Sequence, residues 1–246
     1  MRYIILLVCS FFLTSCNQEK TMSAQEIIDT ALIKSGTNKL SNATMSFKFR
    51  NRAYTATRNN GSFSLERVTK KANELIYDKL TNNGFERFVN SEQITVPDSM
   101  ATKYSGSVNS VHYFSVLPYG LNDAAVQKKL LPEATINSEK YYKVQISFLQ
   151  EGGGEDYDDV FVYWFHKETF QLRYLAYSYH VNGGGMRFRK AVNERIINGI
   201  RIVDYINYKP TNASTKLENL DKAFENSELL KISEINLEDI QIELIH

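Results

Sequence analysis

Hydrophobic and polar residues alternate along most of this chain, with the two-residue period of a β-strand that buries one face. Met45, Phe47 and Phe49, for example, are separated by single polar residues. Turns such as Asn59-Asn60-Gly61 and Asn82-Asn83-Gly84 lie between these segments, and Asn and Gly accept the positive φ angles of tight hairpins. The pattern predicts about five strands between residues 45 and 89 and about six between 133 and 208, followed by closing strands at 229–235 and 237–244.

A helical pattern precedes the strands. Ser23 and Glu26 form a capping box, and Gly36 occupies the position where a left-handed residue commonly ends a helix. Between them, the apolar residues fall on one helical face, at positions 24, 27, 28, 31 and 32. We therefore expect an amphipathic helix at the start of the folded region.

Residues 98–131 interrupt the alternation. Their apolar positions are spaced roughly helically as far as Pro118, and Asn122 could cap a second short helix at 123–130. The expected fold is therefore mainly β, of the α+β kind. It is a curved antiparallel sheet or half-open barrel of about eight to eleven strands, with an N-terminal helix and a central helical insert as a lid. This order of elements resembles the lipoprotein-carrier fold, in which such a half-barrel encloses an apolar cavity.

The first residues have the features of an export signal. Arg2 precedes an apolar run at 3–13, which is too short to span a bilayer. The following Leu13-Thr14-Ser15-Cys16 resembles the lipobox of bacterial lipoproteins. That resemblance implies a signal peptide at 1–15, cleavage before Cys16, lipidation of Cys16, a tether at 16–22 and a single β-rich domain at 23–246. The alternative is an ordinary secretory signal with a chance cysteine.

Asn17 and the residues after it bear on the location. An aspartate at this position would resemble an inner-membrane retention signal, and a run of acids would resemble a surface-export tag; the sequence has neither. We therefore expect a lipid-anchored protein of the cell outer membrane, on the periplasmic face rather than the cell surface, with membrane contact through the N-terminal lipid.

Composition narrows the possible chemistry. The formal charge is only +1, so the chain lacks the basic surface of a nucleic-acid binder. The only cysteines are Cys9 and Cys16, so the predicted mature domain has no thiol for a disulfide, a nucleophile or a metal site. The four histidines have no metal-ligand spacing, and catalytic motifs are absent. We expect no metal and no cofactor.

Most candidate binding residues lie around the hairpin between the fourth and fifth of the late strands. Arg187 and Arg189 share one face of a strand, and His180 could lie across the hairpin from them. Two guanidinium groups on one face can bind a carboxylate or a phosphate. Trp164, Tyr177 and Asn182 complete the candidate set, with Trp164 as core or cavity wall. The alternative is a solvent-facing strand pair whose arginines cover tyrosines or pair with acids.

Three segments resemble an uncharacterised lipoprotein family of flavobacteria and their relatives, a domain of unknown function. They are Phe49-Arg50, residues 163–166 (YWFH) and, most specific, residues 177–189 (YSYHVNGGGMRFR). The resemblance extends from Ala24 to about Tyr208. It implies a class of protein and a compartment, and no reaction.

The leading hypothesis is non-enzymatic binding of a lipid-like or other apolar ligand. It rests on strands such as 160–166, which carry apolar residues on both faces and could line a cavity as well as a core. One alternative is a periplasmic hydrolase or lyase that uses His180 with a carboxylate such as Asp204. Another is an interaction module of an envelope complex with an exposed apolar patch. The sequence leaves the ligand and the oligomeric state open.

Overall fold

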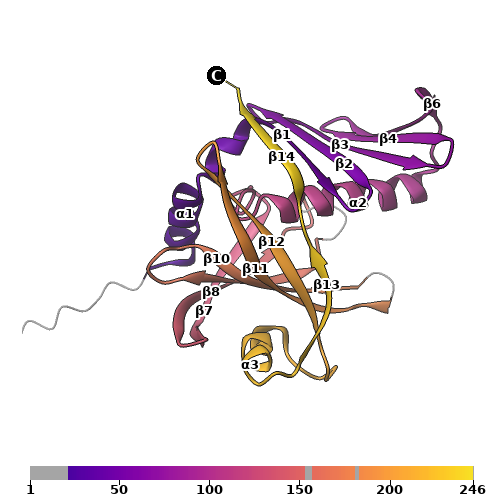
Figure 1. Ribbon diagram of the computed structural model, residues 1–246. Helices are drawn as coiled ribbons and strands as arrows, with labels where there is room; N and C mark the ends of the chain where they lie inside the picture. The colour runs from indigo at the N-terminus through magenta and orange to yellow at the C-terminus, as the bar shows by residue number, and fades with distance from the viewer. Residues whose placement is uncertain (1–21, 153–156, 181–182, 246) are drawn as a thin grey trace, which may run out of the picture.

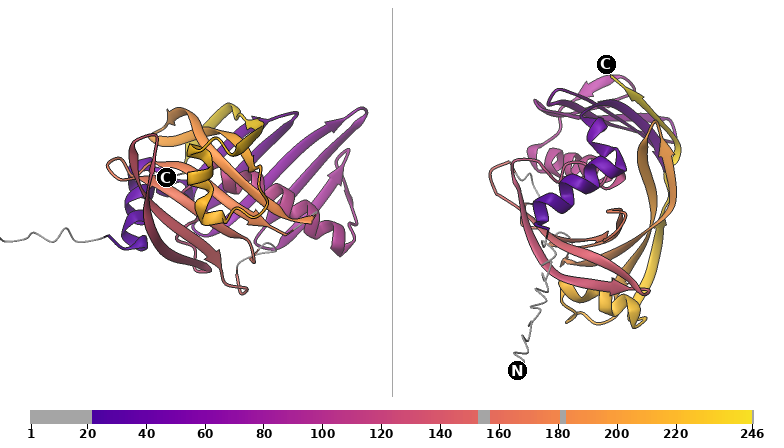
Figure 2. Two further views of the ribbon diagram at one scale, coloured as in Figure 1. Left: turned by 90° about the horizontal axis from the view of Figure 1, so that it is seen from below. Right: turned by 90° about the vertical axis from the view of Figure 1, so that its left-hand side faces the viewer.

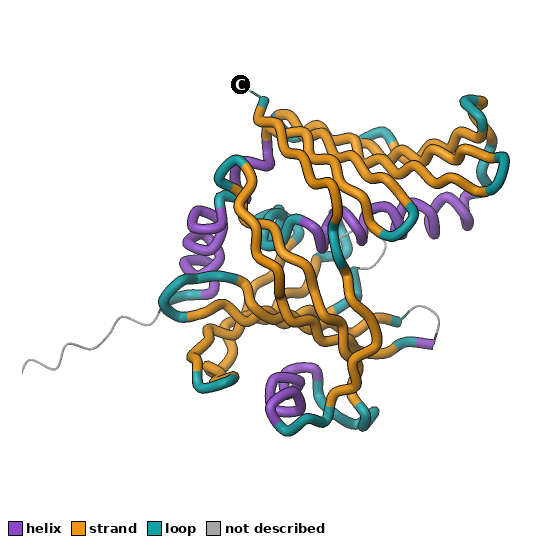
Figure 3. Tube along the Cα trace, viewed as in Figure 1, coloured by secondary structure: helices purple, strands orange, loops and turns teal. Residues whose placement is uncertain are grey.

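The strands of the computed structural model form two antiparallel sheets of seven strands each (Figure 1). The structure describes residues 22–152, 157–180 and 183–245. Strands dominate these residues, and helices occur at a few positions (Figure 3). The predicted class, a mainly β fold with a curved antiparallel sheet that does not close, is confirmed. The number of strands is larger than predicted, and the strands are divided between two sheets.

Sheet A contains the first half of the chain and the last strand, in the order β14-β1-β2-β3-β4-β5-β6. Its hairpins follow the turn chemistry of the sequence: Asn60 and Gly61 have φ angles of 48° and 86°. The strands are β1 (Asn42–Phe49), β2 (Arg52–Asn59), β3 (Ser62–Lys71), β4 (Glu74–Thr81), β5 (Gly84–Val89), β6 (Glu92–Ile94) and β14 (Glu238–Leu244).

Sheet B contains the second half, in the order β13-β12-β11-β10-β9-β8-β7. Its strands are β7 (Val126–Ile136), β8 (Glu139–Phe148), β9 (Val160–His166), β10 (Leu172–Tyr179), β11 (Gly185–Ile197), β12 (Ile200–Pro210) and β13 (Leu229–Ile235). Because β13 and β14 follow one another in the chain, this segment connects the edge of sheet B to the edge of sheet A. The strands form a curved wall with α1 inside its curve (Figure 2).

The helices cover different faces of the sheets. Helix α1 (Ala24–Ser35) is capped at Ser23 and ends at Gly36, as predicted, and packs in the core of sheet B. Helix α2 (Asp98–Ser115) is the predicted central insert and lies along the inner face of sheet A (Figure 1). Helix α3 (Leu220–Glu225) covers the opposite, outer face of sheet B.

The predicted short helix at 123–130 is wrong. Turns lead from α2 into β7, which begins at Val126. Pro132, which suggested the end of a helix, lies instead at a register shift between Leu131 and Ala134. Because β7 is an edge strand, a residue without a backbone N–H is tolerated there.

Candidate functional site

Aromatic side chains of α2 and of two strands of sheet B meet on the inner face of that sheet. Phe161 of β9 and Tyr177 of β10 stack with ring centroids 5.5 Å apart, because alternate residues of paired strands share a face. Phe114, from the last turn of α2, lies 5.1 Å from Tyr177 and 6.2 Å from Phe161. Tyr113 and Tyr163 share a hydrogen bond of 2.6 Å. We call these five residues the inner aromatic cluster.

Arg189 of β11 points into this cluster and is only 8% exposed. Its guanidinium carbon lies 3.8 Å from the ring centroid of Phe114 and 5.1 Å from that of Tyr177, and Nη2 donates a 2.8 Å hydrogen bond to the Tyr177 hydroxyl. The other polar groups that face it are the hydroxyls of Tyr205 and Tyr163. Burial lowers the pKa of Arg189, and its Nε is buried without a hydrogen-bond partner.

Arg187 shares the face of Arg189, as the alternation predicts, but lies nearer the end of the strand. Its guanidinium carbon is 5.0 Å from the Tyr179 ring centroid, and Nη1 donates to the Met186 carbonyl. His180 lies beyond the strand end with its side chain 69% exposed, and its Nε2 is 3.9 Å from an Asp158 carboxylate oxygen. The structure therefore brings together Arg189 and Tyr177 and places His180 outside the cluster.

Trp164 lies on the opposite, outer face of sheet B. It is fully buried under α3, where its Nε1 donates a 3.2 Å hydrogen bond to Asp221. The same carboxylate accepts a hydrogen bond from Lys143. Trp164 therefore does not meet Arg189. Asn182 and Cys16, the remaining candidates, lie outside the described residues.

The inside of the curve is filled by the protein's own side chains. The apolar face of α1 packs with Leu117 and Leu121 against the inner residues of sheet B. Two hollows lie elsewhere, near residues 62–86 and near residues 46–55 with 239–241. The expected apolar cavity is thus not among the hollows found on the described part of the chain, and buried side chains occupy the inside of the curve. A ligand there would have to displace side chains.

Asp204, the carboxylate considered with His180 for a hydrolase or lyase, is committed elsewhere. It pairs with Val192 in the β11–β12 ladder, whereas His180 lies beyond the Tyr179–Gly185 pair at the far end of β10. Asp204 binds Arg195 and accepts a 2.9 Å hydrogen bond from the backbone N–H of Leu237. The structure therefore does not bring His180 and Asp204 together.

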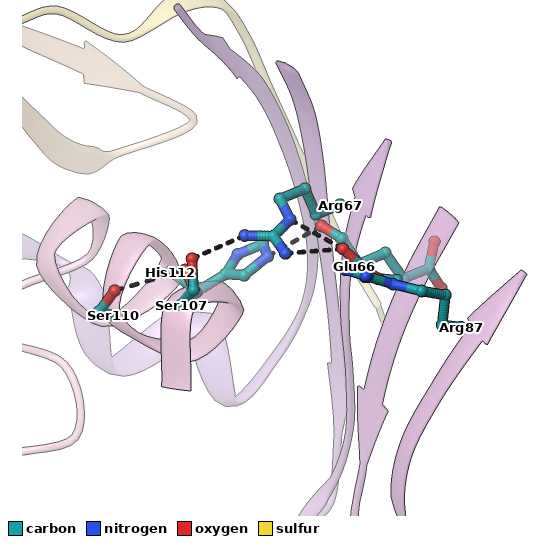
Figure 4. A network of polar contacts seen from close by, with 7 residues as sticks. Glu66, Arg67, Arg87, Ser107, Ser110 and His112 are labelled. Carbon is teal, nitrogen blue, oxygen red and sulfur yellow. Dashed lines mark hydrogen bonds and ion pairs between the residues drawn. The ribbon is translucent and has the colours of Figure 1, made fainter. Parts of the chain in front are cut away.

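The sequence analysis missed a buried polar network between α2 and sheet A (Figure 4). Asp78 accepts hydrogen bonds from Arg67 at 3.0 and 2.7 Å and from Arg87 at 2.6 Å. Arg67 also donates to the hydroxyl of Ser107 on α2 at 2.8 Å. The register of the β3–β4 hairpin places Arg67 opposite Asp78, so recognition of its turn would have predicted this pair.

His112 lies one turn of α2 further on and is almost completely buried. Its Nε2 donates a 3.0 Å hydrogen bond to the Glu66 carbonyl, so Nδ1 is the unprotonated nitrogen, and it has no hydrogen-bond partner. Burial, together with the positive charges of Arg58 and Arg67, lowers the pKa of His112 to about 4. The neutral ring, packed against the edges of Phe47 and Tyr54, is therefore the folded form.

In residues 22–152, 157–180 and 183–245, His, Cys, Asp and Glu form no group of three or more that could hold a metal ion. No helix within these same ranges has the length and hydropathy needed to cross a bilayer.

The fold and the helix-covered inner face define the class of this protein: an incomplete β-barrel with helices on its inner side. A LolA superfamily protein from Nitrosomonas europaea has the same fold, with a TM-score of 0.50, 13% identity, and coverage of 90% of this chain and 94% of that one. A putative outer membrane lipoprotein-sorting protein domain from Vibrio parahaemolyticus, at 8% identity and the same coverage, has a TM-score of 0.46.

The chain belongs to a family of unknown function, DUF6503, whose model matches residues 1–237. This match confirms the resemblance to an uncharacterised family. The predicted origin of that family in flavobacteria stays a prediction. No curated protein matches the sequence.

Proposed function

We propose that this protein is a lipid-anchored envelope protein whose domain binds a lipid-like ligand without catalysing a reaction. The ligand would lie inside the curve of sheet B, in the place that the ring of Phe114 now fills. Cys16 would carry the anchor, at the periplasmic face of the outer membrane.

One observation carries the proposal. Phe114, Phe148 and Tyr177 form a rim that is only partly buried, although each packs against the core of sheet B. An aromatic rim that continues into the protein interior is typical of a site for an apolar chain. An exposed apolar patch for a protein partner would lie on the outside of the fold instead.

The partial exposure of Phe114 supports its displacement by a ligand. Of the eighteen residues of α2, only Val108, His112 and Ser115 are buried, and Phe114 is not among them. The bonds of Ser107 and His112 hold the helix to sheet A, so the ring of Phe114 would turn away while the helix stays in place. Movement of this one ring would open the inner aromatic cluster at a modest cost.

The likeness to a LolA superfamily protein supports the fold of a carrier. We extend to this chain only the coarse property of binding a lipid-like molecule in the cell envelope.

The test is a titration of the purified full chain with N-phenylnaphthylamine, a neutral apolar fluorophore, followed by competition with monoolein. We expect saturable binding of about one probe per chain, because the rim leads to a single interior. The substitution Phe114→Ala removes the side chain that fills this interior and should tighten binding by about fivefold or more.

Leu230→Ala is the matched control, since Leu230 is an exposed apolar residue on the edge strand β13. We expect it to leave the affinity for the probe unchanged. Probe binding that never saturates, or that responds equally to Phe114→Ala and Leu230→Ala, would contradict an interior site.

A further inference from the structure

Arg189 differs from the other deeply buried arginines in what neutralises it. Arg67 and Arg201 form hydrogen-bonded ion pairs with Asp78 and Glu194. Arg58 has the carboxylate of Asp123 in its electrostatic surroundings. For Arg189, among the described residues, only tyrosine hydroxyls take this role.

The surrounding tyrosines cannot supply a negative charge near neutral pH. Burial raises the pKa of Tyr163 and of Tyr113 well above the usual value, and that of Tyr205 to about 12. Their hydroxyls therefore stay neutral. The aromatic ring of Phe114 attracts the guanidinium, but such an attraction offsets only part of the cost of burying a charge.

The guanidinium also retains capacity to bind. Its Nε–H is buried without an acceptor, while Nη2 is used by Tyr177. The ring that covers it, Phe114, is the side chain of α2 that would move when a ligand enters. Displacement of this one ring would expose a fixed, preoriented donor group at the inner end of the aromatic rim.

We propose that Arg189 binds the oxyanion head group of a singly charged amphipathic ligand, such as the carboxylate of a fatty acid, whose apolar chain lies along the rim. This inference rests on the proposed function and names the chemistry of its ligand. One cation among neutral tyrosines is balanced by one negative charge, whereas a doubly charged phosphate monoester would leave one buried charge uncompensated. A phosphodiester lipid carries the same single charge and is the second source of this chemistry.

The experiment compares displacement of N-phenylnaphthylamine from the full chain by oleate and by methyl oleate, which has the same apolar chain and no charge. Lysophosphatidylglycerol provides the phosphodiester arm. We expect oleate, lysophosphatidylglycerol or both to displace the probe at concentrations at least about tenfold lower than methyl oleate, because charge-assisted hydrogen bonds in a dry site are strong.

Variants of Arg189 assign this preference to the guanidinium. Arg189→Gln should reduce the preference to about onefold and leave the affinity for methyl oleate unchanged, while Arg189→Lys should retain part of it. Arg173→Gln, the same change at a half-exposed arginine on β10, is the control and should keep the full preference.

The outcomes separate the two proposals. If the probe and methyl oleate bind but the wild-type chain shows no preference for either anion, the anion site is overturned and the apolar site stands. The same holds if Arg189→Gln keeps the preference. If the probe does not bind at all, the proposed function itself fails. Because the wild-type preference is measured without any substitution, the test does not depend on the folding of a variant.

Discussion

Each sheet buries an arginine on its inner face, in contact with α2. The two arginines differ in what neutralises their charge. Arg67 of sheet A is 5% exposed and is neutralised by Asp78. Arg189 of sheet B is 8% exposed, and its partners among the described residues are aromatic rings and hydroxyls. The first arginine has its counter-charge within the sheet. The second has none in the described part of the chain, and a buried charged group with perturbed surroundings is a candidate for a binding site.

The contrast extends along α2. Ser107 and His112 bind sheet A through polar contacts, whereas the rings of Tyr113 and Phe114, which share the last turn of α2 with His112, contact sheet B. Polar geometry fixes the position of the helix over sheet A. The rings over sheet B are partly exposed and easier to replace by another apolar group. The contact of α2 with sheet A therefore supports the structure, whereas its contact with sheet B is suited to ligand exchange.

The largest effect on stability is expected in sheet A, at the ion pair of Arg67 with Asp78. Asp78→Asn removes the only carboxylate that neutralises Arg67 and should lower the free energy of unfolding by about 3–5 kcal/mol. Urea denaturation followed by far-UV circular dichroism measures this change. Asp239→Asn, at an exposed ion pair with Lys48, is the control and should change stability by less than about 1 kcal/mol. Equal effects of the two substitutions would remove the distinction between the sheets.

The next effect concerns pH. Because burial lowers the pKa of His112 to about 4, the unfolded chain takes up its proton first as the pH falls. Above pH 6.5, the ordinary pKa of histidine, the ring is neutral in both states and the stability is at its full value. Between pH 6.5 and 4 the free energy of unfolding falls by up to about 3 kcal/mol. Urea denaturation across this range should show a steeper loss for the wild type than for His112→Gln. Parallel curves would show that the ring is not the group that titrates.

The smallest effect should have the opposite sign. Arg189→Met replaces an uncompensated buried cation by an apolar side chain of similar length and should raise stability by up to about 1 kcal/mol. Arg67→Met, the same substitution in sheet A, should lower stability by about 3 kcal/mol. Trp164, the only tryptophan, is fully buried in sheet B and reports unfolding there by its fluorescence. A similar loss for both variants would mean that Arg189 is a structural residue.

Local patterns in the sequence predicted most of the elements. Alternation located the strands, Asn-Gly turns located the hairpins, and Ser23 with Gly36 bounded α1, since each of these depends on a few adjacent residues. The division into two sheets depends on pairs such as β1 with β14, which lie almost two hundred residues apart, and no local pattern encodes them. The helix predicted before Pro132 is wrong for the same reason. A strand can contain this proline because β7 lies at the edge of its sheet, and no local pattern shows that position.

The candidate site was predicted in part. Alternation correctly placed Arg187 and Arg189 on one face of a strand, and the structure adds Tyr177, which lies opposite Arg187 in the ladder. Because both faces of β9 are apolar, the sequence did not indicate which face lies inside the curve, and Trp164 proved to lie outside it. The isolation of Arg189 from carboxylates depends on the contact of α2 with sheet B, which strand alternation does not specify.

The segment between β13 and β14 has a consequence for the shape of the whole molecule. In the described part of the chain, no backbone ladder joins the two sheets, so this corner can act as a hinge. Leu237 at this hinge is held on both sides, by Asp204 at its N–H and by Arg195 at its carbonyl. Widening the angle between the sheets would leave every strand pairing intact but would strain these two hydrogen bonds and separate Ile200 and Ile202 from the core of sheet A. Asp204 thereby helps to set how far the barrel stands open.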